Sequence, residues 1–396
     1  MDFSLDHFDK YLNRTPTWSI KWDPDYMIER FGTADLLPFN HAEMDFECPK
    51  PIIDIILQRT NHGIYGYTLV KPDYYDAIIQ WYHHRHNIKF SREEILYSTG
   101  VIFSLRNVIQ FFTNPGDEIL IFPPIYRPLA EAATDQARKL IMGPLHLEER
   151  TYHMDFEQIE RMFKAHSIKL VILCNPHNPV GRVWTRTELK RLGDLCLNYQ
   201  AMIVSDEIHC DLVSQGHHYT SIVDISPELG LKTIALSSMT KTFNTSGLKI
   251  SNIFIKNPEI RAPFFNFYNK KFIYAPNVFG ILGMQAAYNQ CGPWVDLLNQ
   301  YLDDNFQFVQ DYLTENEMNI DLILREGTPL IWLDFRKIPL APNKVFQYLI
   351  KSAHIIPYNG RDFLANGEGF QRLSIGYPRK ILKEGLDRIN KAIKQL

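Results

Sequence analysis

A lysine that directly follows a buried apolar run has the clearest chemical potential in this chain. Lys241 comes after Thr233–Ser238, which predicts a strand, and two hydroxyl side chains, Ser238 and Thr240, stand before it. A lysine that attacks a carbonyl to form a Schiff base needs a lowered pKa, which desolvation or a nearby cation provides. Lys249 could supply that charge and could also pair with a phosphate. The competing interpretation is a lysine on a surface loop.

Two other apolar runs also end in polar residues. Lys169–Cys174 is followed by Asn175–Gly181, and Ala201–Ser205 is followed by Asp206–His209. Ligands of open α/β sheets bind beyond the carboxyl ends of the strands, so we expect these polar groups to converge. A buried carboxylate such as Asp206 is rare unless it is paired. It could face a protonated ring nitrogen of a cofactor, and the alternatives are a helix N-cap or a strand-end hydrogen bond.

Two weaker signals lie earlier in the chain. Gly100 precedes a predicted helix, Ile102–Phe112, and a glycine turn at a helix start leaves free backbone N–H groups for an anion. Any helix start looks similar, so this pattern is weak alone. Tyr126 follows Pro123-Pro124 and could stack on an aromatic cofactor, although a core or surface tyrosine is equally compatible with the pattern.

The elements that must position these residues alternate between strands and helices. This order predicts an α/β fold: a three-layer large domain with a mostly parallel sheet, and a smaller α+β domain. We expect an N-terminal arm over residues 1–50, the large domain over 51–290 and the small domain over 291–396. The expected elements after the arm are helices at Pro72–Asn87, Ile102–Phe112, Thr187–Asn198, Asp296–Glu317, Asn343–Ala353 and Leu382–Leu396, and strands at Glu118–Phe122, Lys169–Cys174, Ala201–Ser205, Thr233–Ser238, Asn252–Ile255, Pro329–Phe335 and Arg372–Ile375.

Composition excludes several classes of protein. The chain has 396 residues, a net charge of −3 and 45% hydrophobic residues. The small net charge gives no long-range field for nucleic acid or an acidic membrane. We find no signal-peptide pattern and no apolar run near the ~20 residues of a membrane span. The five cysteines are scattered, as in reduced cytosolic proteins. We therefore expect a cytoplasmic protein that binds neither nucleic acid nor membrane.

Several motifs together resemble a known family. The general pattern is similar to pyridoxal 5'-phosphate (PLP) enzymes of the aspartate-aminotransferase fold, and the finer pattern is similar to the MalY/PatB group of cystathionine β-lyases. The resemblance covers essentially the whole chain. The motifs that carry it are Ala42-Glu43-Met44-Asp45-Phe46, Gly63-x-Tyr65-Gly66-Tyr67, Pro123-Pro124-x-Tyr126-x-Pro128, Asn178-Pro179-x-Gly181, Asp206-Glu207-Ile208-His209-x-Asp211-Leu212 and Ser238-x-x-Lys241-Thr242-Phe243-Asn244.

The resemblance implies a role for each motif residue. Lys241 carries the cofactor as a Schiff base, Asp206 pairs with its ring nitrogen, and Asn178 pairs with its ring hydroxyl. Tyr126 stacks on the ring, His209 belongs to the cofactor pocket, and Arg372 binds the substrate carboxylate. The family's phosphate site corresponds to Val101, Ile102, Ser238, Thr240 and Lys249. Tyr65 reaches the phosphate and substrate of the other subunit, which implies a homodimer with shared sites.

The implied reaction is β-elimination of a thiol from cystathionine, cysteine or an S-substituted cysteine. A PLP-dependent aminotransferase is the first alternative, and a PLP-bound regulatory protein is the second. The sequence departs from the family at Glu43, Pro329 and Leu364, which neighbour the substrate side of the pocket. The run His83–His86 contains three histidines that do not share one helix face, so we expect a solvated surface and no metal site.

Overall fold

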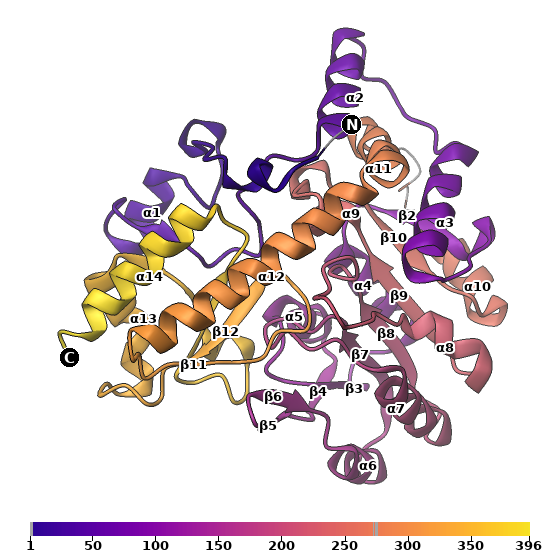
Figure 1. Cartoon of the computed structure of the whole chain (residues 1–396). Helices are drawn as coiled ribbons and strands as arrows, with labels where there is room; N and C mark the ends of the chain where they lie inside the picture. Colours follow the sequence, from indigo (N-terminus) through magenta and orange to yellow (C-terminus); the bar gives the residue numbers. More distant parts are fainter. Residues whose placement is uncertain (1–2, 272, 274–275) are drawn as a thin grey trace.

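The central element of the structure, a computed structural model, is a seven-stranded sheet (Figure 1). The structure describes residues 3–271, 273 and 276–396. The strand order is β2-β10-β9-β8-β7-β3-β4, and only β10 runs antiparallel to its neighbours, so the predicted mostly parallel sheet is confirmed. These strands are β2 (Ile95–Ser98), β3 (Glu118–Ile121), β4 (Lys139–Met142), β7 (Ile168–Cys174), β8 (Met202–Asp206), β9 (Thr233–Ser237) and β10 (Ser251–Phe254).

The sheet separates two apolar cores, which explains the uninterrupted apolar runs. Along β7, Val171 and Leu173 pack into one core, whereas Leu170 and Ile172 pack into the other. Successive side chains of a strand point to opposite faces, so a strand covered on both faces needs apolar residues at every position.

Helices cover both faces of this sheet. On one face pack α4 (Val101–Phe112), α5 (Arg127–Thr134) and α10 (Pro258–Asn269). On the other face pack α3 (Pro72–His86), α6 (Phe156–Ala165), α7 (Arg186–Asn198), α8 (Ile222–Leu229) and α11 (Val278–Gln290). The two remaining helices of this region are the short α9 (Met239–Thr242) and α2 (Lys50–Asn61), which lies against α11.

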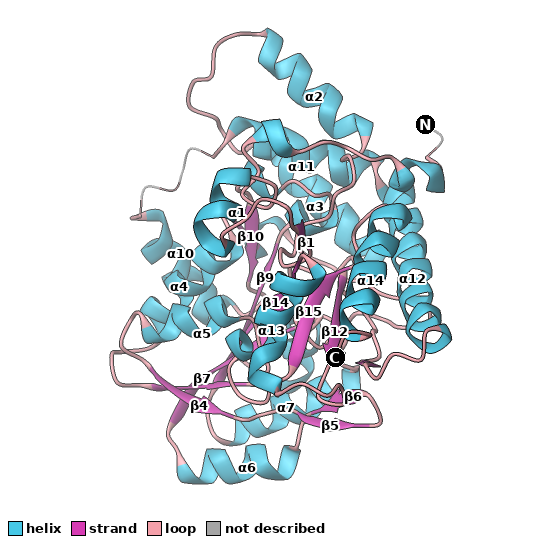
Figure 2. Ribbon diagram, turned by 90° about the vertical axis from the view of Figure 1, so that its left-hand side faces the viewer, coloured by secondary structure: helices cyan, strands magenta, loops and turns pink. Residues whose placement is uncertain are grey.

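The C-terminal part of the chain forms a second, antiparallel sheet of four strands in the order β11-β12-β15-β14. Its helices α12 and α14 lie side by side (Figures 1 and 2). The elements are α12 (Gly292–Glu315), β11 (Asp321–Leu322), β12 (Leu330–Asp334), α13 (Val345–Tyr348), β13 (Ile355–Ile356), β14 (Tyr358–Asn359), β15 (Phe370–Ser374) and α14 (Arg379–Ile393). This agrees with the expected α+β region, while the domain limits at residues 50 and 290 stay a prediction.

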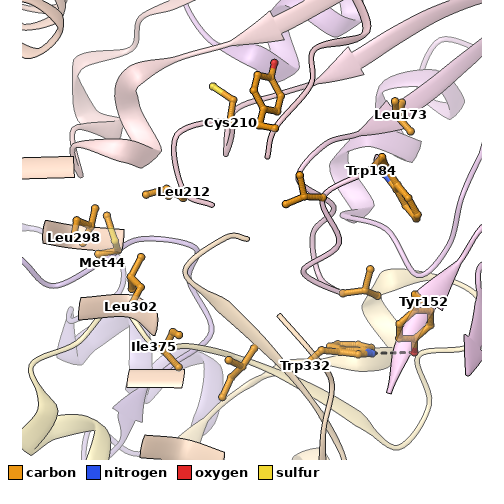
Figure 3. Packing of buried hydrophobic residues seen from close by; sticks show 14 of the residues in the cluster. Met44, Tyr152, Leu173, Trp184, Cys210, Leu212, Leu298, Leu302, Trp332 and Ile375 are labelled. Carbon is orange, nitrogen blue, oxygen red and sulfur yellow. Dashed lines mark hydrogen bonds between the residues drawn. The ribbon is translucent and has the colours of Figure 1, made fainter. Parts of the chain in front are cut away.

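The two regions share a continuous core. Trp332 of β12 donates a hydrogen bond from Nε1 to the hydroxyl of Tyr152 at 3.2 Å, across the boundary between the regions (Figure 3). Tyr152 lies on β6 (Thr151–His153), which pairs with β5 (His146–Glu148). Burial of both aromatic rings fixes the C-terminal region against the large sheet.

The N-terminal arm packs against the C-terminal region. It contains α1 (Pro24–Phe31) and β1 (Leu37–Pro38), and β1 pairs in parallel with β13. Phe8 is fully buried and lies 5.4 Å from Trp294 of α12, measured between ring centroids. The arm is therefore part of the core and not a loose extension.

Two element predictions were wrong in detail. The helix expected over Asn343–Ala353 is divided into a 3-10 turn, the short α13 and a π-helical turn at Leu349–Ala353. Apolar spacing over so few residues does not distinguish these helix types. Arg372, expected to begin a strand, lies in the middle of β15, because its neighbours Phe370 and Gln371 already pair with β12.

Candidate active site

A cavity of about 490 Å³ lies at the carboxyl ends of β7, β8 and β9. The three polar segments that the sequence placed after these strands converge there, as expected. The lining residues are Ala42, Thr99, Gly100, Val101, Ile102, Phe103, Tyr126, Cys174, Asn178, Asp206, Ile208, His209, Ser238, Thr240, Lys241, Ser246, Lys249 and Ile250.

Lys241 lies on α9, the single helical turn after β9. Its Nζ is 3.5 Å from the hydroxyl oxygen of Ser246. Burial lowers the pKa of Lys241 to about 8; the nearby positive charge of Arg372 acts in the same direction, and Glu43 and Asp206 oppose it. A lysine with such a pKa holds far more neutral amine near neutral pH than an ordinary lysine does, and the neutral amine is the form that attacks a carbonyl.

Asp206 is the last residue of β8 and not, as expected, the residue after the strand. Its Oδ1 accepts a hydrogen bond from the backbone N–H of Ile208 at 3.1 Å. Burial raises the pKa of Asp206 to about 6, against the effects of that N–H and of Lys241. A buried carboxylate with one hydrogen bond of this kind is ready to accept a cation, such as a protonated pyridine nitrogen.

The start of α4 offers an anion site. Gly100 occupies the N-cap position without a side-chain cap, so the first N–H groups of the helix at Val101 and Ile102 have no intrahelical acceptor. Both residues line the cavity. The hydroxyls of Ser238 and Thr240, whose oxygens are 2.9 Å apart, and the ammonium of Lys249 line the same cavity. Backbone donors, hydroxyls and an ammonium together fit a phosphate group.

Tyr126 and Asn178 form the next part of the wall. The backbone N–H of Tyr126 donates to the carbonyl of Asn178 at 3.1 Å, so the two residues hold each other in place. Burial raises the pKa of the Tyr126 phenol, which keeps it neutral. The Asn178 Oδ1 accepts a hydrogen bond, whereas its Nδ2 makes none with the residues that the structure describes. That amide group can therefore donate to a ring hydroxyl.

Arg372 does not line this cavity; it lies behind Asn178, with 1% of its surface exposed. Nη1 donates to Asn178 Oδ1, and Nη2 donates to the carbonyl of Asn40. Its guanidinium carbon lies 4.5 Å from the ring centroid of Tyr358 and 5.1 Å from that of Phe363. Nε has no partner among the described residues. Burial lowers the pKa of Arg372 to about 10, so it stays charged and can bind a carboxylate.

His209 lines the cavity and has no partner for its Nδ1 in the described part of the chain. Burial lowers the pKa of His209 to about 3, so its ring is neutral. Tyr65, in contrast, is 53% exposed and is not part of this cavity; its hydroxyl donates to the Thr60 carbonyl and its ring lies 5.6 Å from that of Phe279. Except for Arg372, which contacts the lining residue Asn178, and Tyr65, the predicted site residues all line this one cavity.

Some of the lining residues had no recognised signal in the sequence, including Phe103, Ser246 and Ile250. The sequence analysis also missed His41, whose pKa burial lowers to about 4, with Lys21, Arg372 and Lys241 contributing in the same direction. His41 directly precedes the Ala42–Phe46 motif, so the position of that motif at the cavity was the available signal.

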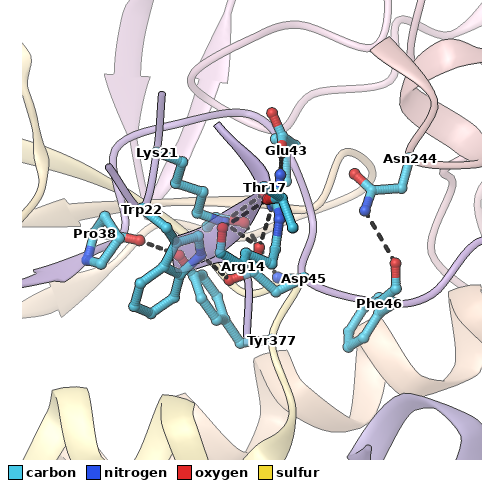
Figure 4. Close-up of polar contacts among 12 residues, drawn as sticks. Arg14, Thr17, Lys21, Trp22, Pro38, Glu43, Asp45, Phe46, Asn244 and Tyr377 are labelled. Carbon is cyan, nitrogen blue, oxygen red and sulfur yellow. Dashed lines mark hydrogen bonds and ion pairs between the residues drawn. The ribbon is translucent and has the colours of Figure 1, made fainter. Parts of the chain in front are cut away.

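Glu43, which differs from the family pattern, belongs to a cluster of charged side chains (Figure 4). Arg14 pairs with both Glu43 and Asp45. Asp45 also accepts hydrogen bonds from Lys21 Nζ at 3.1 Å and from Trp22 Nε1 at 2.8 Å. These contacts fix the segment that contains Ala42 against the earlier part of the N-terminal arm. Pro329 and Leu364 also differ from the family pattern. The carbonyl of Pro329 accepts a hydrogen bond from the backbone N–H of Ile375. Leu364 has a φ of 72°, a backbone conformation that normally favours glycine.

The prediction of a solvated histidine surface was wrong for His86. Its side chain is buried and lies 2.8 Å from Asp211 Oδ1, near Cys210. Sequence spacing could not show this contact, because Asp211 is far away in the chain. Both Asp211 oxygens already accept hydrogen bonds, and burial raises the pKa of the Cys210 thiol well above its usual value. This arrangement fits a hydrogen-bond network better than a metal site that includes Cys210, because a cysteine binds a metal as the thiolate.

Comparisons with known proteins agree with this geometry. Residues 35–389 match the family model described as aminotransferase class I and II. The chain is 36% identical to cystathionine beta-lyase PatB of Bacillus subtilis (strain 168) over 387 residues, which are 98% of this chain and 100% of that protein. It is 31% identical to protein MalY of Escherichia coli (strain K12), with 98% of both chains covered.

Two solved structures are also similar over nearly their whole length. Cystalysin from Treponema denticola, which contains PLP, superposes with a TM-score of 0.93 at 32% identity and 100% coverage of both chains. The PLP-bound C-S lyase from Staphylococcus hominis superposes with a TM-score of 0.90 at 30% identity, covering 99% of this chain and 98% of that one.

Proposed function

The chain belongs to the class I and II aminotransferase family, and we propose that it is a PLP-dependent C–S β-lyase that cleaves cystathionine or related cysteine derivatives to pyruvate, ammonia and a thiol. The observation that carries this proposal is a buried lysine with a pKa of about 8 that shares one cavity with a buried carboxylate and an anion site. The relatives named cystathionine beta-lyase and C-S lyase support the reaction type.

Different residues of the cavity would bind different parts of PLP. Lys241 would bond covalently to the cofactor, Asp206 would pair with its ring nitrogen, and Asn178 would donate to its ring hydroxyl. Tyr126 and His209 would flank the ring. The phosphate of PLP would be held by the residues of the anion site, which are Val101, Ile102, Ser238, Thr240 and Lys249. PLP supplies an electron sink for the pair of electrons that Cα retains when it loses its proton.

The remaining chemistry belongs to side chains of the protein. Arg372 binds the substrate carboxylate and thereby orients the Cα–H bond. With its amine free, Lys241 would remove the Cα proton of the substrate. The Cβ–S bond then breaks, and the sulfur leaves as a thiolate, which a proton converts to the thiol. The resulting aminoacrylate is hydrolysed to pyruvate and ammonia.

A PLP-dependent aminotransferase is the second candidate, because the matching family model carries that description and the same lysine would serve. The two reactions differ in their need for a keto acid. We expect pyruvate from cystathionine without any added keto acid; amino-group transfer that strictly requires a keto acid would overturn the lyase proposal. Reduction with borohydride should fix the cofactor on Lys241, and an adduct on another lysine would contradict the site.

We further propose that the active unit is a homodimer with shared sites. The loop that contains Tyr65 exposes the apolar side chains of Ile64, Tyr67 and Leu69, and a partner subunit would bury them. Tyr65 would then reach the phosphate and substrate of the partner's site.

We also propose a cytoplasmic location. All five cysteines are free, as is usual in a reducing compartment. Among the helices of the described residues, none has the length and apolar composition needed to cross a membrane.

A further inference from the structure

Asp211 is a buried carboxylate outside the cavity that connects three elements. It lies in the turn after β8, and its Oδ1 accepts hydrogen bonds from two side chains of α3, Trp81 Nε1 at 3.0 Å and His86 Nε2 at 2.8 Å. Its Oδ2 accepts a hydrogen bond from the hydroxyl of Thr242 at 2.9 Å. Because Thr242 is the last residue of α9, this one carboxylate bridges α3, the turn and α9.

Thr242 is the chain neighbour of Lys241. Their helix, α9, is a single turn of four residues, and so short a helix has little hydrogen bonding of its own. Side-chain contacts at its two ends therefore decide its position. At the first end the Ser238 hydroxyl donates to the Ile250 carbonyl, and at the second end the Thr242 hydroxyl donates to Asp211.

Asp211 itself is held rigidly. The indole ring of Trp81 stacks on the ring of Tyr288 with centroids 4.7 Å apart. The Asp211 carbonyl accepts a hydrogen bond from Asn299 Nδ2 at 2.8 Å. The turn in which Asp211 lies also contains His209 and begins directly after Asp206. A bond between Asp211 and Thr242 consequently fixes the cavity lysine relative to the wall that it faces.

We propose that Asp211 and Thr242 are positioning residues for Lys241, and that their hydrogen bond keeps the Lys241 amine directed into the cavity. Neither residue lines the cavity, so each acts through the backbone of its neighbours. This inference rests on the proposed function of Lys241 as the residue that bonds to PLP.

The test uses two substitutions of Thr242 that each change one small group of the side chain. Thr242→Val keeps the shape and removes the donor, whereas Thr242→Ser keeps the donor and removes a methyl group. We expect Thr242→Val to lower kcat about tenfold with little change in KM, because a hydrogen bond to a charged group is lost. It should also slow the covalent capture of PLP by the apoprotein, followed by visible absorbance, by about tenfold. Thr242→Ser should stay close to the wild-type protein in both measurements.

Tyr74→Phe is the matched control, because it removes another buried hydroxyl donor, to Asn252 Oδ1, that does not touch Asp211 or α9. It should lower Tm and leave the rate of PLP capture unchanged. If Thr242→Val and Thr242→Ser reduce Tm and PLP capture equally, the positioning role is refuted. If the wild-type apoprotein does not capture PLP on Lys241, the proposed function itself fails, so the two failures are distinguishable.

Discussion

Arg372 Nη1 donates a hydrogen bond to Asn178 Oδ1 at 3.0 Å, which joins the C-terminal antiparallel sheet to the loop that follows β7 of the central sheet. The two residues were assigned different roles, one toward the substrate carboxylate and one toward the cofactor ring. Their contact means that a substrate bound at Arg372 and a cofactor beside Asn178 share one rigid polar wall. Substitution of Asn178 should therefore affect substrate binding as well as cofactor binding.

The first prediction concerns Arg372→Lys. A lysine cannot hold Asn178 and also give a carboxylate two parallel hydrogen bonds. We expect kcat/KM for cystathionine to fall at least about tenfold, because one charge-assisted hydrogen bond contributes ~1.5–3 kcal/mol. The visible absorbance of bound PLP should persist. Arg127→Lys, at a half-exposed ion pair with Asp362, is the control and should stay near wild type. Unchanged kinetics in Arg372→Lys would remove this residue from the substrate site.

The second prediction concerns Asp206→Asn in the apoprotein. The folded pKa of Asp206, about 6, lies above its unfolded value, so ionisation costs stability in the folded state only. Stability present at low pH is consequently lost as the pH rises through about 4 to 6. Asp206→Asn should remove that loss and make the apoprotein more stable than wild type above pH 6, by on the order of 1–3 kcal/mol.

Denaturant unfolding of both apoproteins at pH 4 and pH 7 would measure this difference. In the holoenzyme we expect the opposite functional effect, a kcat lowered at least about tenfold, since the anion beside the ring nitrogen is lost. If the difference in unfolding free energy between the two apoproteins is the same at pH 4 and pH 7, ionisation of Asp206 does not destabilise the fold. That result would contradict the prediction.

The third prediction concerns the pH dependence of Lys241. The neutral amine is the nucleophile, so PLP capture by the apoprotein should accelerate as the pH rises through about 8, well below the usual lysine pKa of 10.5. Glu43 stabilises the protonated amine, so Glu43→Gln should move the midpoint to lower pH. Glu47→Gln, at an exposed pair with Lys10, should not move it. A midpoint near 10 in the wild-type apoprotein would show that Lys241 is not desolvated.

The fourth prediction concerns the shared site. Tyr65→Phe and Lys241→Ala each impair both sites of their own homodimer. A hybrid dimer would contain one site with neither substitution, if Tyr65 acts in the partner's cavity. Mixing the two inactive variants under subunit exchange should therefore restore up to about a quarter of wild-type activity, because half of the dimers are hybrids with one intact site. Activity that never exceeds that of the parents would refute the shared-site proposal.

The sequence by itself determined five of the seven strands of the central sheet, all but β2 and β4, and most of the cavity. The runs before Asn175, Asp206 and Lys241 are apolar at successive positions because both faces of their strands are buried, and the chain must turn at the same edge of the sheet after each run. The convergence of polar residues that follow parallel strands can therefore be predicted without knowledge of other contacts. For that reason Lys241, Asp206 and Asn178 could be assigned to one site from local patterns.

Tertiary structure decided the contacts between distant segments. Arg372 meets Asn178, and His86 and Thr242 meet Asp211, although nothing in the local spacing pairs them. A periodic pattern reports which face of an element is buried, but it carries no information about which side chain of another element lies opposite. That choice follows from the packing of α3 and the C-terminal sheet against the central sheet, where a buried charge is stable only beside the donors and acceptors that packing brings to it.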